Sequence, residues 1–345
     1  MIKIIIFSLL HILINKIFLK FNFLLDRKQI SYHKKKIDNK TLTPLSGGIV
    51  FIIFISFFYY DYNITLILFT LFIYLIGVMS DLDFLSSPLK RIILQSLTIL
   101  VFILLENISI ESISIDWFDI LLEFRVFNII FLSICILVII NGFNFLDGVN
   151  TLVLGYMLIN LLAIYHLSNN FSLNFNLELY KGLITILSIV FIFNFFGLSF
   201  LGDSGTYSLS FFIGVLFIIF AFENYEKISP YYVSCLLWYP AIENLFSILR
   251  RYISKRELSK ADNGHLHHLL YVFIKNLNIT SNSLFQNTLT GMTINIYVFI
   301  SIIVASNYYL HTKVLLSVIF FNIFIYLSVY FLLNKLINKN KKKGI

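Results

Sequence analysis

The sequence predicts an all-α protein that crosses a membrane many times. Of its 345 residues, 59% are hydrophobic and only 13% are charged, whereas soluble domains are about 45–50% apolar and about 25% charged. The apolar residues form runs of roughly 16–22 residues, the length that a helix needs to cross about 30 Å of hydrocarbon. These runs do not alternate polar and apolar residues, which argues against the strands of an outer-membrane barrel.

Hydropathy predicts eleven membrane-spanning helices. Their expected ranges are 2–22, 46–60, 64–80, 91–105, 125–141, 152–167, 179–196, 205–222, 229–249, 291–308 and 314–333. The first range is too long for a removable signal peptide and lacks a small-residue cleavage site, so we expect a retained anchor. With no internal repeat and no separate soluble stretch, residues 1–345 are expected to form a single transmembrane domain.

Lysine and arginine are concentrated in alternate loops between the predicted helices. They gather at 27–40, 90–91, 250–275 and in the lysine-rich tail 335–345, whereas the opposite loop at 106–123 is acidic. The positive-inside rule places the basic loops in the cytoplasm, with the N-terminus outside and the C-terminus inside. The net charge of +8 therefore indicates membrane topology and not nucleic-acid binding.

Polar clusters occur at the predicted cytoplasmic ends of the helices. The segments expected to carry catalysis are about 26–48, 77–91, 141–151, 197–207 and 239–290. A transporter or flippase would more often bury ionisable groups near the middle of the bilayer. The distribution favours one catalytic face at the membrane surface and leaves a lipid-linked sugar flippase as the alternative from another class.

Asp203 follows Gly202 at the start of the eighth predicted helix, where backbone amides can face a phosphate. An oxygen ligand suits Mg²⁺, which usually takes one or two protein groups and completes its shell with water and substrate phosphate. The alternative role for Asp203 is a helix cap.

Asn141, Asn144 and Asp147 recur every three residues at the end of the fifth predicted helix. This spacing aligns them on one face, where two amides and a carboxylate can share a pyrophosphate–metal site. The alternative is that they only cap the helix.

Asp81 and Lys90 belong to the segment GVMSDLDFLSSPLKR at 77–91. We expect Asp81 to orient an acceptor phosphate or the metal shell. A general base is not required, because a phosphate monoester with a second pKa near 6 is mostly dianionic at pH 7. Lys90, or its neighbour Arg91, is expected to steer an anionic lipid or nucleotide, the alternative being a topological anchor.

His265, His267 and His268 lie close together in the predicted cytoplasmic loop after the ninth helix. No cysteine or carboxylate completes a tetrahedral zinc set with them, so a phosphate-binding loop is the preferred interpretation. The other residues of this loop and of the ninth helix that we expect to bind substrate are Glu243, Arg250, Arg251 and Asp262.

Together, the NxxNFxDG, FxGDxG and HxHH elements resemble those of the polyprenyl-phosphate N-acetylhexosamine-1-phosphate transferases of glycosyltransferase family 4. The resemblance covers roughly residues 20–270. It is closer to the enzymes that start O-antigen, common-antigen or capsule repeats, because HLHHLL differs from the HHHFE loop of the phospho-N-acetylmuramoyl-pentapeptide transferases.

The resemblance implies an enzyme of the bacterial inner membrane that transfers N-acetylhexosamine 1-phosphate from a UDP-sugar to undecaprenyl phosphate and releases UMP. It implies Mg²⁺, with Mn²⁺ as the alternative, and Asp203 and Asn144 as its ligands. Asp81, Asp147 and the three histidines would complete the catalytic set. The expected partners are UDP-N-acetylhexosamine, undecaprenyl phosphate and membrane lipid, with no nucleic acid and a homodimer as an open option.

Several positions depart from the family pattern. Ser80 replaces the first residue of an Asp-Asp pair, Asn150 and Thr151 replace an Asp and a Gly, and Glu243 replaces an Asp. Relatives also often have a basic residue at 198–199, which reads Leu-Ser here. These departures leave a catalytically weakened relative as a further alternative.

Overall fold

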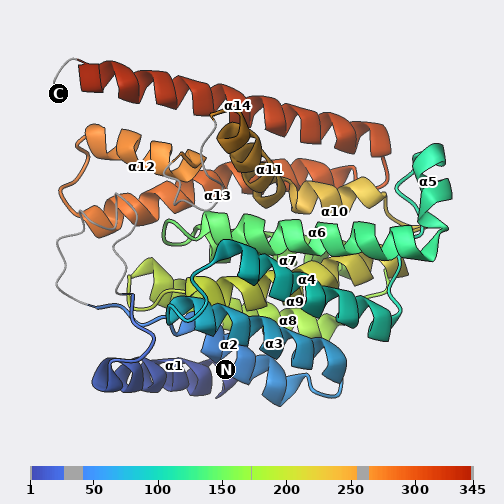
Figure 1. Cartoon of the computed structure of the whole chain (residues 1–345), viewed down its shortest axis with the longest axis horizontal. Coiled ribbons are helices and arrows are strands. Elements are labelled where there is room, and N and C mark those ends of the chain that lie inside the picture. Colours follow the sequence, from blue (N-terminus) through green and yellow to red (C-terminus); the bar gives the residue numbers. More distant parts are fainter. Residues whose placement is uncertain (1, 27–41, 172, 255–263, 343–345) are drawn as a thin grey trace.

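The computed structural model describes residues 2–26, 42–171, 173–254 and 264–342. These residues form fourteen helices and no strand (Figure 1). The helices are α1 (Ile2–Phe21), α2 (Gly47–Phe58), α3 (Ile64–Asp81), α4 (Pro88–Glu106), α5 (Asp116–Leu122), α6 (Arg125–Leu146), α7 (Leu152–Asn170), α8 (Leu177–Phe195), α9 (Gly202–Glu223), α10 (Pro230–Leu236), α11 (Trp238–Ile253), α12 (Leu266–Asn276), α13 (Ser283–Asn307) and α14 (Thr312–Lys342). The all-α polytopic fold class is confirmed.

All eleven predicted spans fall on helices, but two of them are not straight, full-length crossings. Within the described ranges, nine helices are long and apolar enough to span a membrane. Helix α2 has only 12 residues, about 18 Å at 1.5 Å per residue, so range 46–60 is shorter than expected. Range 229–249 is broken, because α10 and α11 meet at a bend of 70°.

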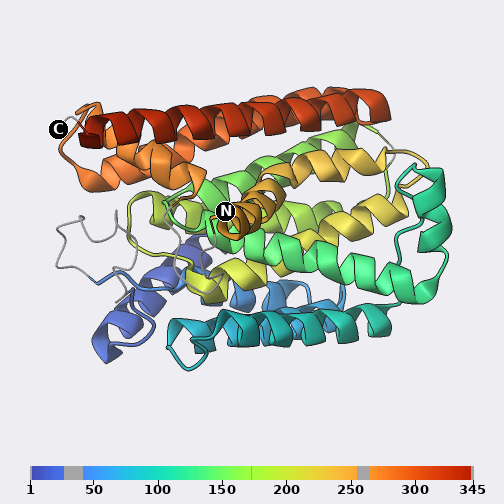
Figure 2. The same ribbon diagram turned by 45° about the horizontal axis from the view of Figure 1, so that its top comes forward.

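Most helices run along the long axis of the molecule in alternating directions (Figures 1 and 2). Helix α5 lies at one end of the bundle, whereas α12 and the C-terminal end of the chain lie at the other. The junctions α3–α4, α6–α7 and α8–α9 also lie at the α12 end, which we call the site end. The polar segments singled out in the sequence therefore converge on one end of the bundle.

Helix α9 lies at the centre and packs against α2, α3 and α6. In its apolar stretch 78% of the residues are buried, against 22% in α4 and in α14. Two glycines bring the neighbouring backbones close to α9. A Cβ added at Gly77 would lie 2.3 Å from Ser204 Cα, and one added at Gly48 would lie 2.5 Å from Gly205 Cα. Only residues without a side chain allow this approach.

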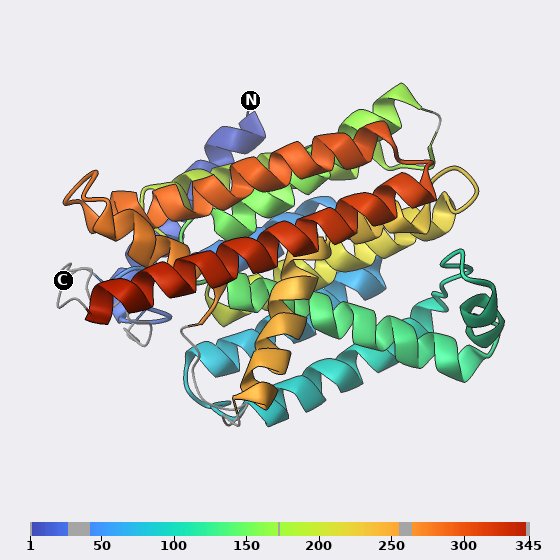
Figure 3. The same ribbon diagram turned by 90° about the horizontal axis from the view of Figure 1, so that it is seen from above.

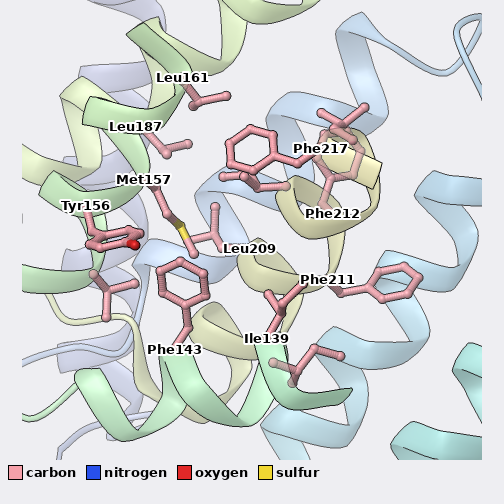
Figure 4. Packing of buried hydrophobic residues seen from close by; sticks show 14 of the residues in the cluster. Ile139, Phe143, Tyr156, Met157, Leu161, Leu187, Leu209, Phe211, Phe212 and Phe217 are labelled. Atoms are coloured by element: carbon pink, nitrogen blue, oxygen red, sulfur yellow. The ribbon is translucent and has the colours of Figure 1, made fainter. Parts of the chain in front are cut away.

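The hydrophobic core fills the space where α6, α7, α8 and α9 meet (Figure 4). Phe143 of α6 and Tyr156 of α7 make an edge-to-face pair with ring centroids 5.5 Å apart. The other core side chains labelled in the figure are Ile139, Met157, Leu161, Leu187, Leu209, Phe211, Phe212 and Phe217. Because apolar lipid gives little drive to bring helices together, such close packing is a main source of association in the membrane.

The bend between α10 and α11 has a specific cause. In a straight helix the carbonyl of Leu236 would accept the N–H of residue 240, but this residue is Pro240 and has none. Tyr156 Oη and Asn160 Nδ2 of α7 donate to that carbonyl instead, both at 2.8 Å. Helix α11 consequently runs across its neighbours (Figure 3), and Gly142 of α6 contacts the Pro240 carbonyl.

Candidate active site

Asp203, in the first turn of α9, lies at the centre of the polar side chains at the site end. Its Oδ1 accepts a hydrogen bond from Asn144 Nδ2 at 2.8 Å. Its Oδ2 accepts Ser80 Oγ and forms an ion pair with Arg91 Nη1 at 2.8 Å. Arg91 Nη1 also lies 2.8 Å from Ser80 Oγ and 3.4 Å from Tyr207 Oη. Four helices, α3, α4, α6 and α9, thus meet at one carboxylate.

Asp81 at the end of α3 fixes the start of α9. Its two carboxylate oxygens accept the backbone N–H groups of Asp203 at 2.9 Å and Ser204 at 3.0 Å. Gly202 makes this possible, because its φ is +69° and an added Cβ would lie 2.9 Å from Asp81 Oδ2. The expectation that these amides face a phosphate is therefore not met in this conformation, since Asp81 already occupies two of them.

Asn141, Asn144 and Asp147 do not share one set of partners. Asp147 ends α6, and its Oδ2 accepts Thr206 Oγ1 at 3.2 Å. Thr206 lies one turn after Asp203 on α9, so the two residues share a face of that helix. Asp147 and Asn144 therefore contact the same face of α9. Asn141 instead donates to Gln95 Oε1 of α4 at 3.2 Å and to the carbonyl of Leu137 at 2.9 Å.

Residues 43–48, with the sequence TPLSGG, support the segment that leads into α9. The carbonyl of Pro44 accepts the N–H of Phe200 at 2.9 Å, and the N–H of Gly47 donates to the carbonyl of Phe200 at 3.1 Å. Residues 43–48 therefore hold the backbone just before Asp203. Within the described part of expected segment 26–48, this contact is made by main-chain atoms.

The three histidines lie against the end of α6. A Cβ added at Gly148 would lie 2.2 Å from His267 Nε2 and 2.9 Å from His268 Cε1, so the glycine permits this contact. His265 Nδ1 lies 2.9 Å from Glu243 Oε1, and its ring is 5.2 Å from that of Phe145. Glu243 is fully buried and thus meets the site through His265. Its carboxylate orients the imidazole ring.

The two arginines of α11 take different positions. Arg250 donates to the carbonyl of Gly264 and, at 3.2 Å, to Tyr330 Oη of α14. The guanidinium of Arg251 lies 5.8 Å from the ring centre of Phe145, two residues before Asp147. Burial raises the pKa of Tyr271, one turn after His268.

The structure brings most of the predicted residues together, but with exceptions. Lys90 is exposed, and Arg91 is the cation that reaches Asp203. Asp262 lies outside the described residues. Ser80 and Thr206 also contact the predicted carboxylates, although no motif marked them as ligands. Ser80 stands next to Asp81 and Thr206 lies one helical turn after Asp203, so their positions were a usable signal. The choice between Lys90 and Arg91 needed the orientation of α4.

The side chains around Asp203 fit a magnesium ion. Carboxylate and amide oxygens are its preferred protein ligands, and one or two are enough. Asn144 donates through its nitrogen here, but a half-turn of the amide presents its oxygen to the same space. The described residues contain no group of three or more His, Cys, Asp or Glu arranged around a metal position.

Residues 63–221 match the model of glycosyl transferase family 4. This stretch contains Asp81, Asn144, Asp147 and Asp203. The chain is 25% identical over 256 residues to the probable undecaprenyl-phosphate N-acetylglucosaminyl 1-phosphate transferase of Bacillus subtilis (strain 168), covering 69% of the chain and 68% of that protein.

Two further relatives carry related names. The phospho-N-acetylmuramoyl-pentapeptide-transferase of Dictyoglomus turgidum is 30% identical over 190 residues, 52% of this chain and 60% of that protein. The undecaprenyl-phosphate alpha-N-acetylglucosaminyl 1-phosphate transferase of Thermotoga maritima is 26% identical over 245 residues, 68% of this chain and 70% of that protein. The resemblance inferred from the motifs is confirmed.

Proposed function

Residues 63–221 of this chain belong to glycosyl transferase family 4, and on that premise we propose that the protein transfers an N-acetylhexosamine 1-phosphate from a UDP-sugar to undecaprenyl phosphate. The observation that carries the proposal is the convergence of Asn144, Ser80 and Arg91 on the Asp203 carboxylate. The names of the relatives support the kind of donor and acceptor.

The proposed reaction is a single displacement at phosphorus. An oxygen of the lipid phosphate attacks the β-phosphorus of the UDP-sugar, the bond between this phosphorus and the oxygen bridging to UMP breaks, and UMP leaves with the bonding electrons. No proton must be removed from the nucleophile, since the phosphate monoester is mostly dianionic at pH 7. The products are a polyprenyl-diphosphate sugar and UMP.

The residues around Asp203 suit a reaction in which phosphate charge must be balanced. Asp203 and Asn144 would hold Mg²⁺, which neutralises charge on the pyrophosphate when bound. The guanidinium of Arg91 presents several donors to phosphate oxygens. Asp81 keeps Asp203 in place through the start of α9. His265, His267 and His268, next to Gly148, would bind the donor phosphates from the opposite side.

The lipid acceptor is supported by the apolar surface beside the site. Helices α4 and α11 both pack against α6, and near the site end they expose large apolar side chains to the membrane. These include Ile93, Leu94 and Leu97 of α4 and Leu249, Tyr252 and Ile253 of α11. A polyprenyl chain lying along this surface brings its phosphate to the level of Arg91.

Ser80 bears on whether the protein is a weakened relative. A serine at this position removes one carboxylate, but its hydroxyl donates to Asp203 Oδ2. Three acidic groups remain at this end. Asp203 lies on α9, and Asp81 and Asp147 are hydrogen-bonded to that helix. This arrangement supports an active enzyme rather than a degenerate one.

The cellular setting follows from the same proposal. We place the protein in a bacterial inner membrane, with the site end and the C-terminus in the cytoplasm, because the basic α3–α4 junction, with Lys90 and Arg91, and the lysine-containing end of α14 lie at that end. The reaction would be the first membrane step of a cell-surface polysaccharide such as an O-antigen or a capsule.

The test is transfer of labelled sugar phosphate from a panel of UDP-N-acetylhexosamines to undecaprenyl phosphate by the purified protein. We expect a lipid-linked diphosphate sugar and UMP with Mg²⁺, and none with EDTA. Asp203→Asn should lower turnover by roughly 10²–10³-fold, the cost typical of losing an electrostatic group at a reacting phosphate.

The matched control is Asp119→Asn, in the α5 segment at the opposite end. Asp119 accepts hydrogen bonds from Ser112 Oγ and from the N–H of Ile113, so this variant also removes a bonded carboxylate charge. It should transfer sugar phosphate like the wild type. No product with any donor, from protein that remains folded, would refute the proposed reaction.

A further inference from the structure

Asn194, in the last turn of α8, joins two segments that belong to the site. Its Oδ1 accepts the backbone N–H of Thr151 at 2.6 Å, and its Nδ2 donates to the carbonyl of Ser199 at 3.2 Å. The side chain is 5% exposed. Because an amide carries one acceptor and one donor on adjacent atoms, a single side chain satisfies a loop N–H and a loop C=O 48 positions apart in the sequence.

The two joined segments carry the expected metal and phosphate groups. Ser199 lies four residues before Asp203, and the intervening backbone is held by residues 44–47. Thr151 closes the turn that begins at Asp147 and contains Gly148, against which His267 lies. The two hydrogen bonds of Asn194 therefore set the distance between the segment leading into Asp203 and the turn that begins at Asp147.

The turn at Thr151 requires such a restraint. Thr151 has φ +68° and ψ −20°, a left-handed conformation that is unfavourable for a β-branched residue. Its N–H precedes α7 and has no partner within that helix. Asn295 Nδ2 of α13 holds the carbonyl of Thr151 at 2.9 Å, and Asn287 Oδ1 accepts the N–H of Asn150 at 2.6 Å.

At the other end of the turn, Thr206 Oγ1 of α9 donates to Asp147 Oδ2 at 3.2 Å. Asn295 and Asn287 bind the turn to α13, which does not carry Asp203. Asn194 differs from them, because it connects the turn directly to the segment leading into Asp203.

We infer that Asn194 is a positioning residue that holds the Asp147–Thr151 turn at the distance from Asp203 needed for metal and donor binding. It touches neither substrate nor metal and acts through the backbone of both segments. The inference rests on the proposed function for the identity of the donor, but the metal affinity that it predicts is measured separately from catalysis.

The test compares Asn194→Leu with Asn322→Leu. Asn322 of α14 is also buried, with 1% of its surface exposed. It too makes two hydrogen bonds, accepting one from Tyr297 Oη and donating one to Ser301 Oγ, both at 2.7 Å. Neither bond reaches a site segment. Both substitutions remove one buried amide of the same size from a helix. Binding of Mn²⁺ is followed by electron paramagnetic resonance, and thermal unfolding is measured on the same samples.

We expect Asn194→Leu to weaken Mn²⁺ binding by roughly 10-fold or more, the effect typical of losing an outer-shell partner. Asn322→Leu should lower the unfolding temperature by a similar amount and leave Mn²⁺ affinity within about two-fold of wild type. In transfer assays, Asn194→Leu should raise the KM for the UDP-sugar, whereas Asn322→Leu should not.

Asn194→Gln provides a second measurement if the leucine variant does not fold. Glutamine keeps the donor and acceptor but displaces them by one methylene, so Mn²⁺ affinity should lie between those of Asn194→Leu and wild type. Equal Mn²⁺ affinity in the Asn194 and Asn322 variants, or no Mn²⁺ binding by the wild type, would overturn the inference. If the wild type binds Mn²⁺ and only the Asn194 variants lose it, but no sugar phosphate is transferred, the proposed reaction fails and the positioning role stands.

Discussion

The site end and the segment between α4 and α6 are both rich in polar side chains, yet they use them differently. At the site end, Asp203 bonds to Ser80, Arg91 and Asn144, which are between 59 and 123 positions away in sequence. In the α5 segment, Asp119 bonds to Ser112 and Ile113, six or seven positions away.

The polar groups at the site end connect different helices and form a site, whereas those of the α5 segment stabilise a local loop. In the α5 segment, polar groups satisfy nearby backbone. Asn128, in the first turn of α6, likewise bonds to both main-chain groups of Ile110 and to the carbonyl of Leu122. At the site end, each side chain belongs to a different helix end. Loss of a site-end group should therefore lower the catalytic rate, and loss of an α5-segment group should lower only the stability of the fold.

The largest contrast between the two regions is expected for a pair of arginines, one in each. Arg91→Ala should lower kcat/KM by about 10²-fold, because it removes a cation from the carboxylate and phosphate region. Arg125→Ala removes a guanidinium that bonds to Asn107 Oδ1 and to the carbonyl of Ile108, and should leave kcat/KM within about two-fold.

Lys90→Ala is the second control for Arg91, since it removes the neighbouring but exposed charge. It too should leave steady-state kinetics near wild type. A loss for Lys90→Ala as large as for Arg91→Ala would mean that general positive charge on α4 matters and not the ion pair with Asp203.

A stability effect without a catalytic effect is expected for Asn128→Leu. The substitution leaves three backbone groups of the α5 segment without their side-chain partner, which should cost about 1–3 kcal/mol. Thermal unfolding in detergent should show the loss, while kcat at low temperature stays unchanged. A large fall in kcat would contradict the separation between the two regions.

The smallest effect is expected for Tyr156→Phe. One of two donors to the Leu236 carbonyl is lost, and Asn160 keeps the other. Hydrogen bonds between membrane helices contribute about 0.6 kcal/mol on average, so unfolding should shift only slightly. Asn160→Leu combined with Tyr156→Phe should destabilise more than the sum of the single variants, since the carbonyl then has neither donor.

The order of the apolar helices could be predicted from the sequence, because an apolar run of membrane-spanning length identifies a helix by itself. The short helices α5 and α12 fall in predicted loops and were not predicted. The bend at α10–α11 was not predicted, although Pro240 was visible in the sequence, since a break in a membrane helix is tolerated only where neighbouring groups satisfy the freed carbonyl. Tyr156 and Asn160 satisfy it here, and their position depends on how α7 packs against α10.

The candidate site was predictable in its residue types but not in its pairings. The motifs around Asp203 and Asn144 indicated a common site, and the structure brings the two side chains within 2.8 Å. The contacts of Asp81 with backbone amides and the burial of Glu243 against His265 could not be read from spacing. They depend on which helix ends lie next to one another.

The sequence by itself determined that this protein lies in a membrane as a set of helices and that its unusual polar residues lie near helix ends, because hydrophobic length and residue type are local properties. The tertiary structure alone decided that Arg91 rather than Lys90 meets Asp203, and that Asn194 connects two distant segments. The physical reason is that a hydrogen bond or ion pair requires two groups within about 3 Å, and the distance between helices far apart in sequence is set by packing against α9.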